Sequence, residues 1–455
     1  MPTAYTILFL LIILVALSTW FIPSGSYDYV DGVPVAGTYH ATQANPQGIG
    51  DILKAAFSGF YDAVDVCIFI LMVGGFLGVV MKTGAVDAGV GNVIRLLGGR
   101  EKWLIPILML LFGLGGTTYG MWEETMAFYP LLIPVFLAAG YDAVVGISVI
   151  LLGAGAGVIA STVNPFATGI AAGFAGVSLG EGIVLRLLEW VAFEAAAIWF
   201  VMAYAAKVKK NPSKSVVGVG AGKIQVSMDQ QVSFTAKRKV IMALFTLTFL
   251  IMVYAVVPFD EMGLSLPALG WWFPELSALF LVAGVVIGLI DRMSEEELVE
   301  TYVAGCADLL GVAFIIGISR GITVLMNDGA ITDTVLHWGE QALSGAGAIS
   351  FTLLVFALYL PLTILIPSSS GLATLSIPIV APLGKFAGVG GDLVVTAFQS
   401  ASGLVNIITP TAAVVMGALA LGHVPYDRWV KYVWKLILWF LLLALAFLVA
   451  GVLLG

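Results

Sequence analysis

The chain has 455 residues, of which 60% are hydrophobic and only 11% charged, and its formal net charge is −8. A soluble protein carries roughly 25% charged residues, so this composition excludes a soluble globular fold. The apolar residues come in runs long enough for helices, about 17–25 residues, and not in the alternating pattern of a barrel. We therefore expect an all-α polytopic membrane protein. The two short basic clusters, at 207–214 and 237–239, are typical of membrane edges, so we expect no nucleic-acid partner.

The first half of the chain predicts one leading span and one structural unit. Residues 1–50 hold the first transmembrane helix and a loop, and the helix is expected to be retained because no basic start or small-residue cleavage site accompanies it. Residues 51–206 form the unit that we call repeat 1. Its predicted elements are a scaffold helix near 63–81, a hairpin at 101–139, a broken helix at 143–176 and a helix at 184–206.

The second half predicts a similar series. A basic linker at 207–239 and two further scaffold helices within 240–295 precede residues 296–455, which form repeat 2. Its predicted elements are a scaffold helix near 309–326, a hairpin at 347–387, a broken helix at 392–421 and a helix at 429–453. Both hairpins turn through short, weakly charged, glycine-containing segments. Such segments favour re-entrance over two full crossings, because polar backbone at membrane depth must line a cavity or be buried in protein.

The two repeats also match in sequence. FSGFYDAVD at 57–65 resembles YVAGCADLL at 302–310, and STVNP at 161–165 resembles SGLVNI at 402–407. These landmarks keep the same order at a separation of about 245 residues. Chance similarity between apolar helices is the alternative, but the ordered landmarks favour a true repeat.

The distribution of basic residues predicts the orientation. With the N-terminus in the cytoplasm, the basic linker lies inside, and the loop 23–50, which has no Lys or Arg, lies outside. The two repeats are then inverted relative to each other. Inverted repeats with broken helices are typical of secondary transporters, and their site is expected where the two hairpin turns and the two helix breaks converge.

Two adjacent acids in the first hairpin, Glu123 and Glu124, are the leading candidates for function. A charge at the bilayer centre costs about 3 kcal/mol, and Lys102 at the hairpin base is the nearest basic residue in the sequence. We expect at least one acid to hold a substrate cation, a proton or Na+; the alternative is hydrogen bonding to a helix N-terminus. Adjacent helical positions diverge by about 100°, and we favour Glu124 with Thr125 as the pair that faces a ligand.

Hydroxyl, amide and glycine positions complete the predicted site. Hairpin turns present free backbone N–H groups to a substrate carboxylate, and unwound helices present oxygens to Na+ or a polar substrate. The alternatives are helix capping and helix–helix hydrogen bonds. The substrate-binding candidates are Thr117, Thr118, Tyr119, Gly120, Glu123, Glu124, Thr125, Asn164, Ser368, Ser369, Ser370, Gly371 and Asn406. The ion-binding candidates are Ser161, Thr162, Asn164, Ser400, Ser402, Asn406 and Thr409.

Arg320 is the one basic residue deep inside a predicted span. Its candidate partners are Glu194, Asp308, Asp328 and a substrate carboxylate. The sequence has no nucleophile triad, metal-ligand cluster or phosphate-binding motif, so we expect neither an enzyme nor an ATP-driven pump.

Several stretches resemble a known family. The run GMWEETMAFYPLLIPVFLAAGYDAVVG, the run LLGAGAGVIASTVNPFATGIAAG, the start MPTAYTILFL and the turn at 367–374 are similar to the YfcC family of the DcuC-type carriers. The resemblance covers essentially the whole chain. It implies the ion transporter superfamily fold: a homodimer in which each protomer has a scaffold part, a mobile part, two opposed hairpins and an elevator-type motion. The tips Thr-Thr-Tyr-Gly and Ser-Ser-Ser-Gly depart from the Ser-Asn-Thr tips of the sodium–dicarboxylate branch.

Members of this family are named for C4-dicarboxylates, arginine–ornithine exchange or basic amino acids. We expect a secondary active transporter of amino acids, of cationic ones such as arginine or ornithine in particular. The alternative is a Na+- or H+-coupled C4-dicarboxylate carrier; a channel and a membrane enzyme are weaker alternatives. No cofactor is expected beyond Na+ or H+ as a coupling ion. The expected place is a prokaryotic cytoplasmic membrane, crossed several times, with the N-terminus in the cytoplasm.

Overall fold

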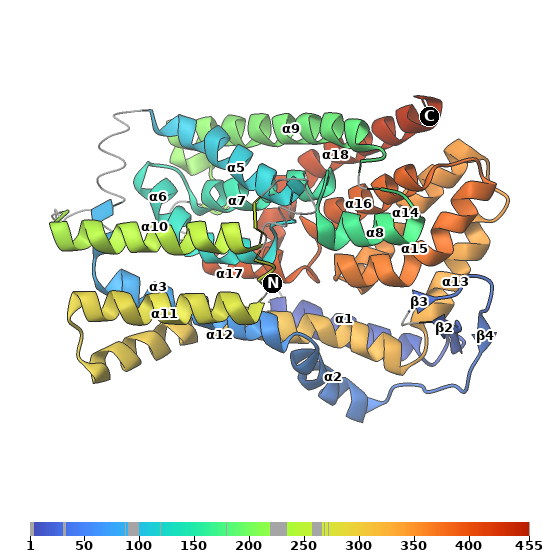
Figure 1. Ribbon diagram of the computed structural model, residues 1–455, viewed down its shortest axis with the longest axis horizontal. Helices are drawn as coiled ribbons and strands as arrows, with labels where there is room; N and C mark the ends of the chain where they lie inside the picture. Colours follow the sequence, from blue (N-terminus) through green and yellow to red (C-terminus); the bar gives the residue numbers. More distant parts are fainter. Residues whose placement is uncertain are drawn as a thin grey trace.

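The computed structural model describes residues 4–30, 33–86, 88–89, 100–118, 120–178, 180–218, 234–256, 266–267, 269–271 and 273–454. They form a mostly helical molecule, elongated along the horizontal axis of Figure 1. Five of the described helices are long and apolar enough to cross a membrane, by length and composition: α3, α11, α12, α14 and α18.

The helices fall into two series separated by a connecting pair. The first series comprises α1 (Ala4–Ser18), α2 (Ile49–Asp62), α3 (Val64–Lys82), η1 (Glu101–Trp103), α5 (Leu104–Thr118), η2 (Glu123–Phe128), α6 (Tyr129–Ala138), α7 (Ala143–Ile159), η3 (Pro165–Gly169), α8 (Ile170–Ala175) and α9 (Ile183–Lys210). The connecting part comprises η4 (Pro212–Lys214), α10 (Ala236–Val256) and α11 (Phe273–Asp291). The second series comprises α12 (Glu295–Asp328), α13 (Thr332–Leu343), α14 (Ala348–Leu365), α15 (Ser369–Phe386), α16 (Gly391–Asn406), α17 (Ala413–Leu421) and α18 (Tyr426–Leu454).

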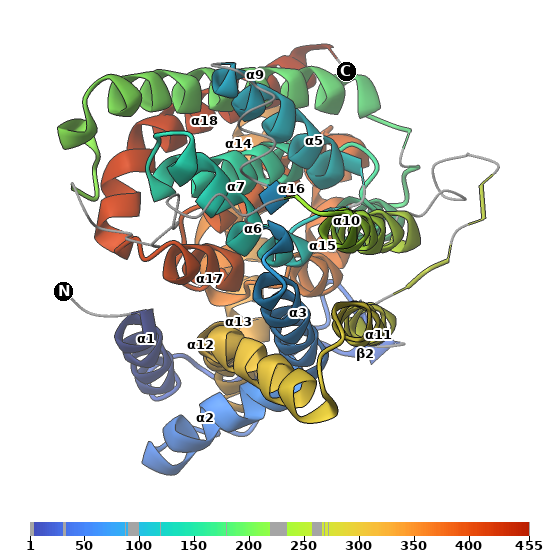
Figure 2. The same ribbon diagram turned by 90° about the vertical axis from the view of Figure 1, so that its left-hand side faces the viewer.

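Two packed groups of helices result. Helices α1, α2, α3 and α11 pack around α12, and we call them the α12 group. Helices α5, α6, α7, α9, α14, α15, α16 and α18 pack around one another, and we call them the α7 group. Figure 2 shows the α12 group below the α7 group, with α17 in between. The short helix η2 contacts α3 of the first group, α7 of the second, and α17. The boundary between the groups is therefore also where the first hairpin and α17 lie.

Helix α12 is longer than the span predicted at 309–326. It begins fourteen residues earlier, at Glu295, where Ser294 caps it by accepting a hydrogen bond from the N–H of Glu297 at 3.2 Å. Three acids occupy the first turn, and negative charge is stabilising at a helix N-terminus. Because these first turns are charged, the hydropathy of the sequence marks only the later part of the helix.

In the core of the α12 group, the backbones of α2 and α3 pack directly against the backbone of α12. Helices α2 (14 residues) and α3 (19 residues) are interrupted at Ala63, whereas α12 runs for 34 residues without a break. A side chain on Gly59 would collide with the backbone of Gly317, and one on Gly78 would lie 2.9 Å from Cα of Gly305. Glycine at these positions is what lets the helices touch main chain to main chain.

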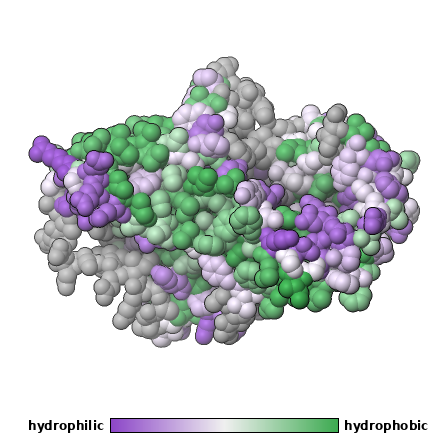
Figure 3. All heavy atoms as spheres, turned by 90° about the horizontal axis from the view of Figure 1, so that it is seen from below, coloured by the Kyte–Doolittle hydropathy of each residue, from purple (hydrophilic) through white to green (hydrophobic). Residues whose placement is uncertain are grey.

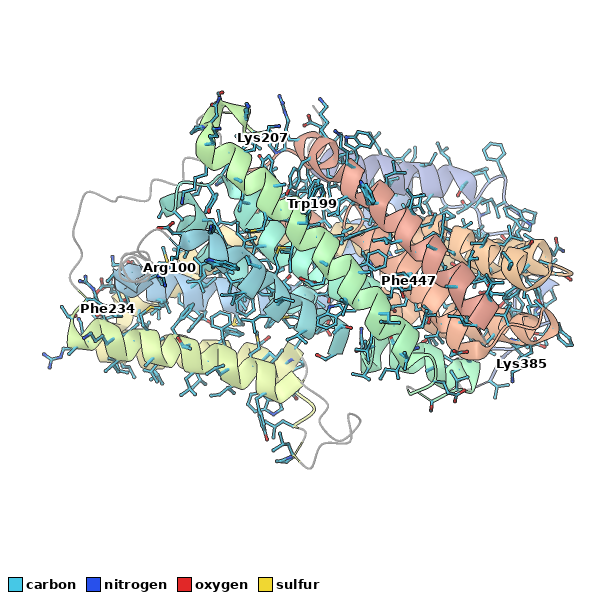
Figure 4. The ribbon with its side chains drawn as sticks, turned by 90° about the horizontal axis from the view of Figure 1, so that it is seen from above. Arg100, Trp199, Lys207, Phe234, Lys385 and Phe447 are labelled. Atoms are coloured by element: carbon cyan, nitrogen blue, oxygen red, sulfur yellow. The ribbon has the colours of Figure 1, made fainter. Side chains whose placement is uncertain are left out.

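Charged residues lie toward both ends of the long axis. Figure 4 shows Arg100 and Lys207 in its left half and Lys385 near its right end. Figure 3 shows apolar residues in the middle of the lower face and hydrophilic residues gathered toward the ends. An apolar belt with polar ends is the pattern of a protein that spans a bilayer along this axis.

The loop after α1 packs on α13. Two short antiparallel ribbons form it: β1 (Gly25–Ser26) pairs with β4 (His40–Ala41), and β2 (Tyr29–Val30) pairs with β3 (Val33–Pro34). The Tyr29 hydroxyl donates to Asp333 at 2.8 Å. Burial, and then this hydrogen bond to a carboxylate, raise the pKa of the Tyr29 phenol.

Candidate functional site

Two hairpins lie in opposite halves of the molecule. We call α5 with η2 and α6 hairpin 1, and α14 with α15 hairpin 2; Figure 1 shows them toward opposite ends of the long axis. The broken helices are α7, which is followed by break 1 (residues 160–164), and α16, which is followed by break 2 (residues 407–412).

The tip of hairpin 1 is tied to break 1. The Thr117 hydroxyl donates to the carbonyl of Ala160 at 2.8 Å, and the Thr162 hydroxyl donates to the carbonyl of Thr117 at 2.9 Å. Gly120 has a left-handed backbone, with φ of 78°, and a Cβ there would lie 2.5 Å from the Asn164 side-chain nitrogen. Glycine is the residue that accepts this backbone and this approach without strain. The predicted candidates Thr117, Gly120, Thr162 and Asn164 thus come together.

The tip of hairpin 2 reaches break 2 in a similar way. Ser368 caps α15 by accepting a hydrogen bond from the N–H of Gly371 at 3.2 Å. Asn406, the last residue of α16, donates its side-chain N–H to the Ser369 hydroxyl at 3.5 Å. Each broken helix therefore places an asparagine against the tip of one hairpin.

The two broken helices, α7 and α16, pack against each other. A Cβ on Gly403 would lie 2.6 Å from Cα of Ile159, and the Gln399 side chain donates to the carbonyl of Val158 at 2.7 Å. Gly155 contacts Ile407 of break 2 and lies beside the ring of Trp122 in hairpin 1. The two breaks and both tips therefore converge on one region.

The two acids of hairpin 1 have different surroundings. Glu124 is buried, and its Oε2 accepts a hydrogen bond from the N–H of Trp122 at 3.1 Å, while Thr125 donates its hydroxyl to the Trp122 carbonyl. Glu124 thus stabilises the turn before η2 by hydrogen bonding to the backbone at the start of that helix. This is the structural role that the sequence allows as the alternative to ligand binding. Glu123 is partly exposed, and the charged groups that act on it are Arg320 and Asp65.

Arg320 of α12 acts electrostatically on Glu123 of hairpin 1. Its Nε lies 3.6 Å from Oδ2 of Asp62, so its partner is none of Glu194, Asp308 and Asp328. The physical reason is the backbone crossing of α2 with α12, which places Asp62 less than one turn after Gly59 and beside Arg320. Among the described residues here, Asp62, Asp65 and Glu123 outnumber the single guanidinium.

The ion-binding candidates divide into engaged and open oxygens. The Thr168 hydroxyl donates to Ser161 at 2.7 Å, the Ser400 hydroxyl donates to Glu189 at 2.7 Å, and Thr409 bonds Thr411. Ser402 Oγ and Asn406 Oδ1 are buried, and the described part of the chain offers them no hydrogen-bond partner. These two oxygens are the ones free to take a cation or water.

Two of the described tip candidates, Thr118 and Ser370, are not brought to break 1 or break 2 by any described contact. The Thr118 hydroxyl donates to the carbonyl of Leu114 in its own helix at 2.6 Å. Ser370 lies 3.5 Å from Ser368, and both are partly exposed. Tyr119 lies outside the described residues.

Comparison with known proteins gives the family. A family model described as "DcuC: C4-dicarboxylate anaerobic carrier" matches residues 1–453. The chain belongs to this family. It is 35% identical to an uncharacterized protein of Haemophilus influenzae, over 99% of this chain and 97% of the relative. It is 30% identical to the "Putative basic amino acid antiporter YfcC" of Escherichia coli, over 95% of this chain and 92% of the relative.

Solved structures of low similarity were also found for this DcuC-family chain. The YdaH transporter of Alcanivorax borkumensis has 14% identity and a TM-score of 0.45, with 98% of both chains covered. MtrF of Neisseria gonorrhoeae has 18% identity and a TM-score of 0.43, with 98% of this chain and 94% of that chain covered.

Sequence reasoning on this DcuC-family chain did not single out one cluster. Glu189 and Arg186 on α9 are fully buried, and Glu189 accepts the hydrogen bond of Ser400 near the convergence. The sequence carried a signal for this cluster: Arg186 and Glu189 are one turn apart within the apolar stretch 183–193, so they share a face of the helix.

A cavity of about 910 Å³ opens between the two helix groups of this DcuC-family chain. Residues of α1 and α12 line one side, including Tyr5 and Asp308. Residues of α17, of α18 and of the loop between them line the other side, including His423 in that loop and Asp427 in α18. A second cavity of about 450 Å³ shares Asp308 and Leu421 with it. Asp308 therefore stands where both cavities meet.

Proposed function

We propose that this DcuC-family transporter is a secondary active carrier that exchanges basic amino acids, such as arginine and ornithine. One observation supports the substrate class. Among the described residues, the charged groups near Glu123 at the tip of hairpin 1 are mostly acidic, and the guanidinium there, that of Arg320, already has Asp62 as its partner. The name of the Escherichia coli relative supports the same class.

The geometry suggests how such a substrate would be held. The α-carboxylate would accept hydrogen bonds from the free N–H groups at the start of α15, where Ser368 and Gly371 form the cap. A helix N-terminus favours an anion at this place. The side-chain cation of the substrate would form an ion pair with the carboxylate of Glu123. Glu123 is preferred over Glu124 because one carboxylate oxygen of Glu124 is used by the Trp122 N–H.

We infer alternating access from the two helix groups. In this proposal the α12 group is the scaffold, and the α7 group carries both tips and both breaks past it in an elevator-like movement. Both hairpins would be re-entrant, the two repeats inverted, and the protein a homodimer in a prokaryotic cytoplasmic membrane with its N-terminus inside. The cavity between the groups would give access to the site, and Asp308 in its wall would attract a cationic substrate.

The second candidate is a C4-dicarboxylate carrier, which the description of the family favours. Such a substrate needs two anion sites. The start of α15 and Arg320 are available for them, provided that Arg320 leaves Asp62.

Counterflow in proteoliposomes separates the two. Vesicles loaded with arginine are expected to take up labelled arginine and ornithine, and C4-dicarboxylates are expected not to compete. Glu123→Gln removes a charged contact worth about 1.5–3 kcal/mol, so the KM for arginine is expected to rise by about tenfold to a hundredfold. Glu296→Gln, at an exposed position of α12, is the matched control and is expected to change nothing. Competition by a C4-dicarboxylate stronger than that by ornithine would favour the second candidate and contradict the first.

A further inference from the structure

One face of α9 buries ionisable side chains, while apolar side chains cover the opposite face. Arg186, Glu189 and Glu194 are 1%, 0% and 2% exposed, whereas Val191 and Trp199 are more than half exposed. Figure 4 shows α9 along the outside of the molecule beside α18, with Trp199 on it. The polar face of α9 therefore points toward the protein interior, as expected for a functional face of a membrane helix.

In the first part of this face, at Arg186 and Glu189, the buried charged groups have polar or charged partners. Glu189 accepts the Ser400 hydrogen bond at 2.7 Å, and Arg186 acts on it electrostatically. Arg186 itself donates to the carbonyl of Glu181 at 2.9 Å, and Asp392 of α16 acts on it. This end of α9 holds positive and negative groups together.

Glu194 stands apart from that network. Both of its carboxyl oxygens are buried, and neither has a hydrogen-bond partner in the described chain. It lies about 16 Å along the helix from the first residue of α9. Helix α5 packs directly on Glu194. Gly113 of α5 has no side chain, so Oε2 of Glu194 occupies the space that a side chain there would fill.

Within the described part of the chain, the elements that pack most closely against α9 (α5, α7, α18 and η4) bring no cation to Glu194. Helices α5 and α7 contain no ionisable residue. Helix α18 contributes Phe440, which packs on Phe193, and none of its residues after Lys435 ionises. Its Lys431, Tyr432 and Lys435 line a cavity with Tyr204 and Lys207, at least ten positions further along α9. The remaining ionisable groups on these elements are Tyr426, Asp427 and Arg428 at the start of α18, before Lys431. The others are Lys214 of η4, beyond the end of α9, and Arg186, Glu189, Lys209 and Lys210 on α9 itself.

We propose that Glu194 is a proton-binding site of this transporter. An ionised carboxylate without a partner at this depth costs several kcal/mol, so the carboxyl holds its proton while α5 lies against it. When the α5 arm of hairpin 1 separates from α9, water reaches the carboxyl. The acid then gives its proton to water, forming a carboxylate and a hydronium ion, and no other reactant is needed.

The position of Glu194 links this proton to the transport site. Helix α5 ends at Thr118, and its Thr117 holds the tip of hairpin 1 on break 1. A movement of α5 that frees the carboxyl therefore also moves the tip that carries Glu123. The inference names H+ as a coupling ion and does not depend on which substrate is carried.

Proton movement in reconstituted vesicles tests the proposal. The full chain is reconstituted with a pH-sensitive dye in the lumen, and labelled arginine and lumenal pH are followed together. Glu194→Gln keeps the shape of the neutral acid but cannot release a proton. It is expected to lose substrate-driven proton movement and to keep arginine counterflow within about twofold of the wild type. Glu194→Asp restores an ionisable group and is expected to regain proton movement.

The control is Glu181→Gln, which removes an exposed acid shortly before the same helix and is expected to leave both measurements unchanged. Undiminished proton movement in Glu194→Gln would overturn the proposal. A second measurement needs no substrate: after a pH jump, infrared difference spectra of the wild type should show a protonated-carboxyl band that Glu194→Gln lacks. An identical band in both proteins would overturn the proposal as well. Absence of arginine transport with loss of this band would instead overturn the substrate class alone.

Discussion

Gly120→Ala is the sharpest test of the contact between hairpin 1 and break 1. The left-handed backbone at this position, with φ of 78°, costs an alanine about 1–2 kcal/mol. The new Cβ would also lie 2.5–2.7 Å from three side-chain atoms of Asn164, which must then rotate away. That rotation removes the hydrogen bond that Asn164 accepts from the N–H of Ala167, worth about 1 kcal/mol. The sum is about 2–3 kcal/mol.

Gly140→Ala separates the two contributions. Gly140 has nearly the same backbone, with φ of 83°, and a Cβ there would meet nothing within 4 Å. It is expected to lower the midpoint of thermal unfolding in detergent through the backbone cost alone. Gly120→Ala should lower it further and should also raise the KM of transport by about fivefold, which corresponds to the extra 1 kcal/mol. Equal effects of the two substitutions on both measurements would refute the role given to Asn164.

Three further predictions concern side-chain hydrogen bonds. Thr117→Val removes the hydroxyl that holds the tip of hairpin 1 and should reduce transport, whereas Thr118→Val, which removes a bond within one helix, should not. Tyr204→Phe removes a 2.6 Å bond to the buried Asp142 and should destabilise the protein by about 1.5–3 kcal/mol, measured by thermal unfolding. The folded-state pKa of Tyr29 is raised, so the stability from its bond to α13 should be present at neutral pH and be lost as pH rises above about 10; Tyr29→Phe should abolish this pH dependence.

The family and the helical membrane class were predictable because local patterns carry them. Apolar runs of spanning length occur in one segment after another, and motifs such as the Glu-Glu-Thr turn at 123–125 are specific; the comparison confirms the DcuC family. The substrate, the re-entrance of the hairpins and the dimer stay predictions.

The roles of single residues were less predictable, because they depend on partners distant in the sequence. Thr117 and Thr118 are neighbours of one type, but only Thr117 reaches a hydroxyl and a carbonyl of break 1. Arg320 was expected beside Glu194, Asp308 or Asp328, and its partner is Asp62, which a backbone crossing brings near. Sequence shows that these residues are unusual for a membrane span, but it does not show which helices touch.

The glycine crossing in the α12 group has a consequence for how the protein responds to its bilayer. The main chains meet directly at two places, Gly59 with Gly317 and Gly78 with Gly305. Rotation of a side chain therefore cannot change the spacing of the helices at these contacts. A change in bilayer thickness must then be absorbed by tilting of the whole group, at a cost of fractions of a kcal/mol per ångström. Lipid chain length should therefore alter transport mainly through the orientation of this rigid frame.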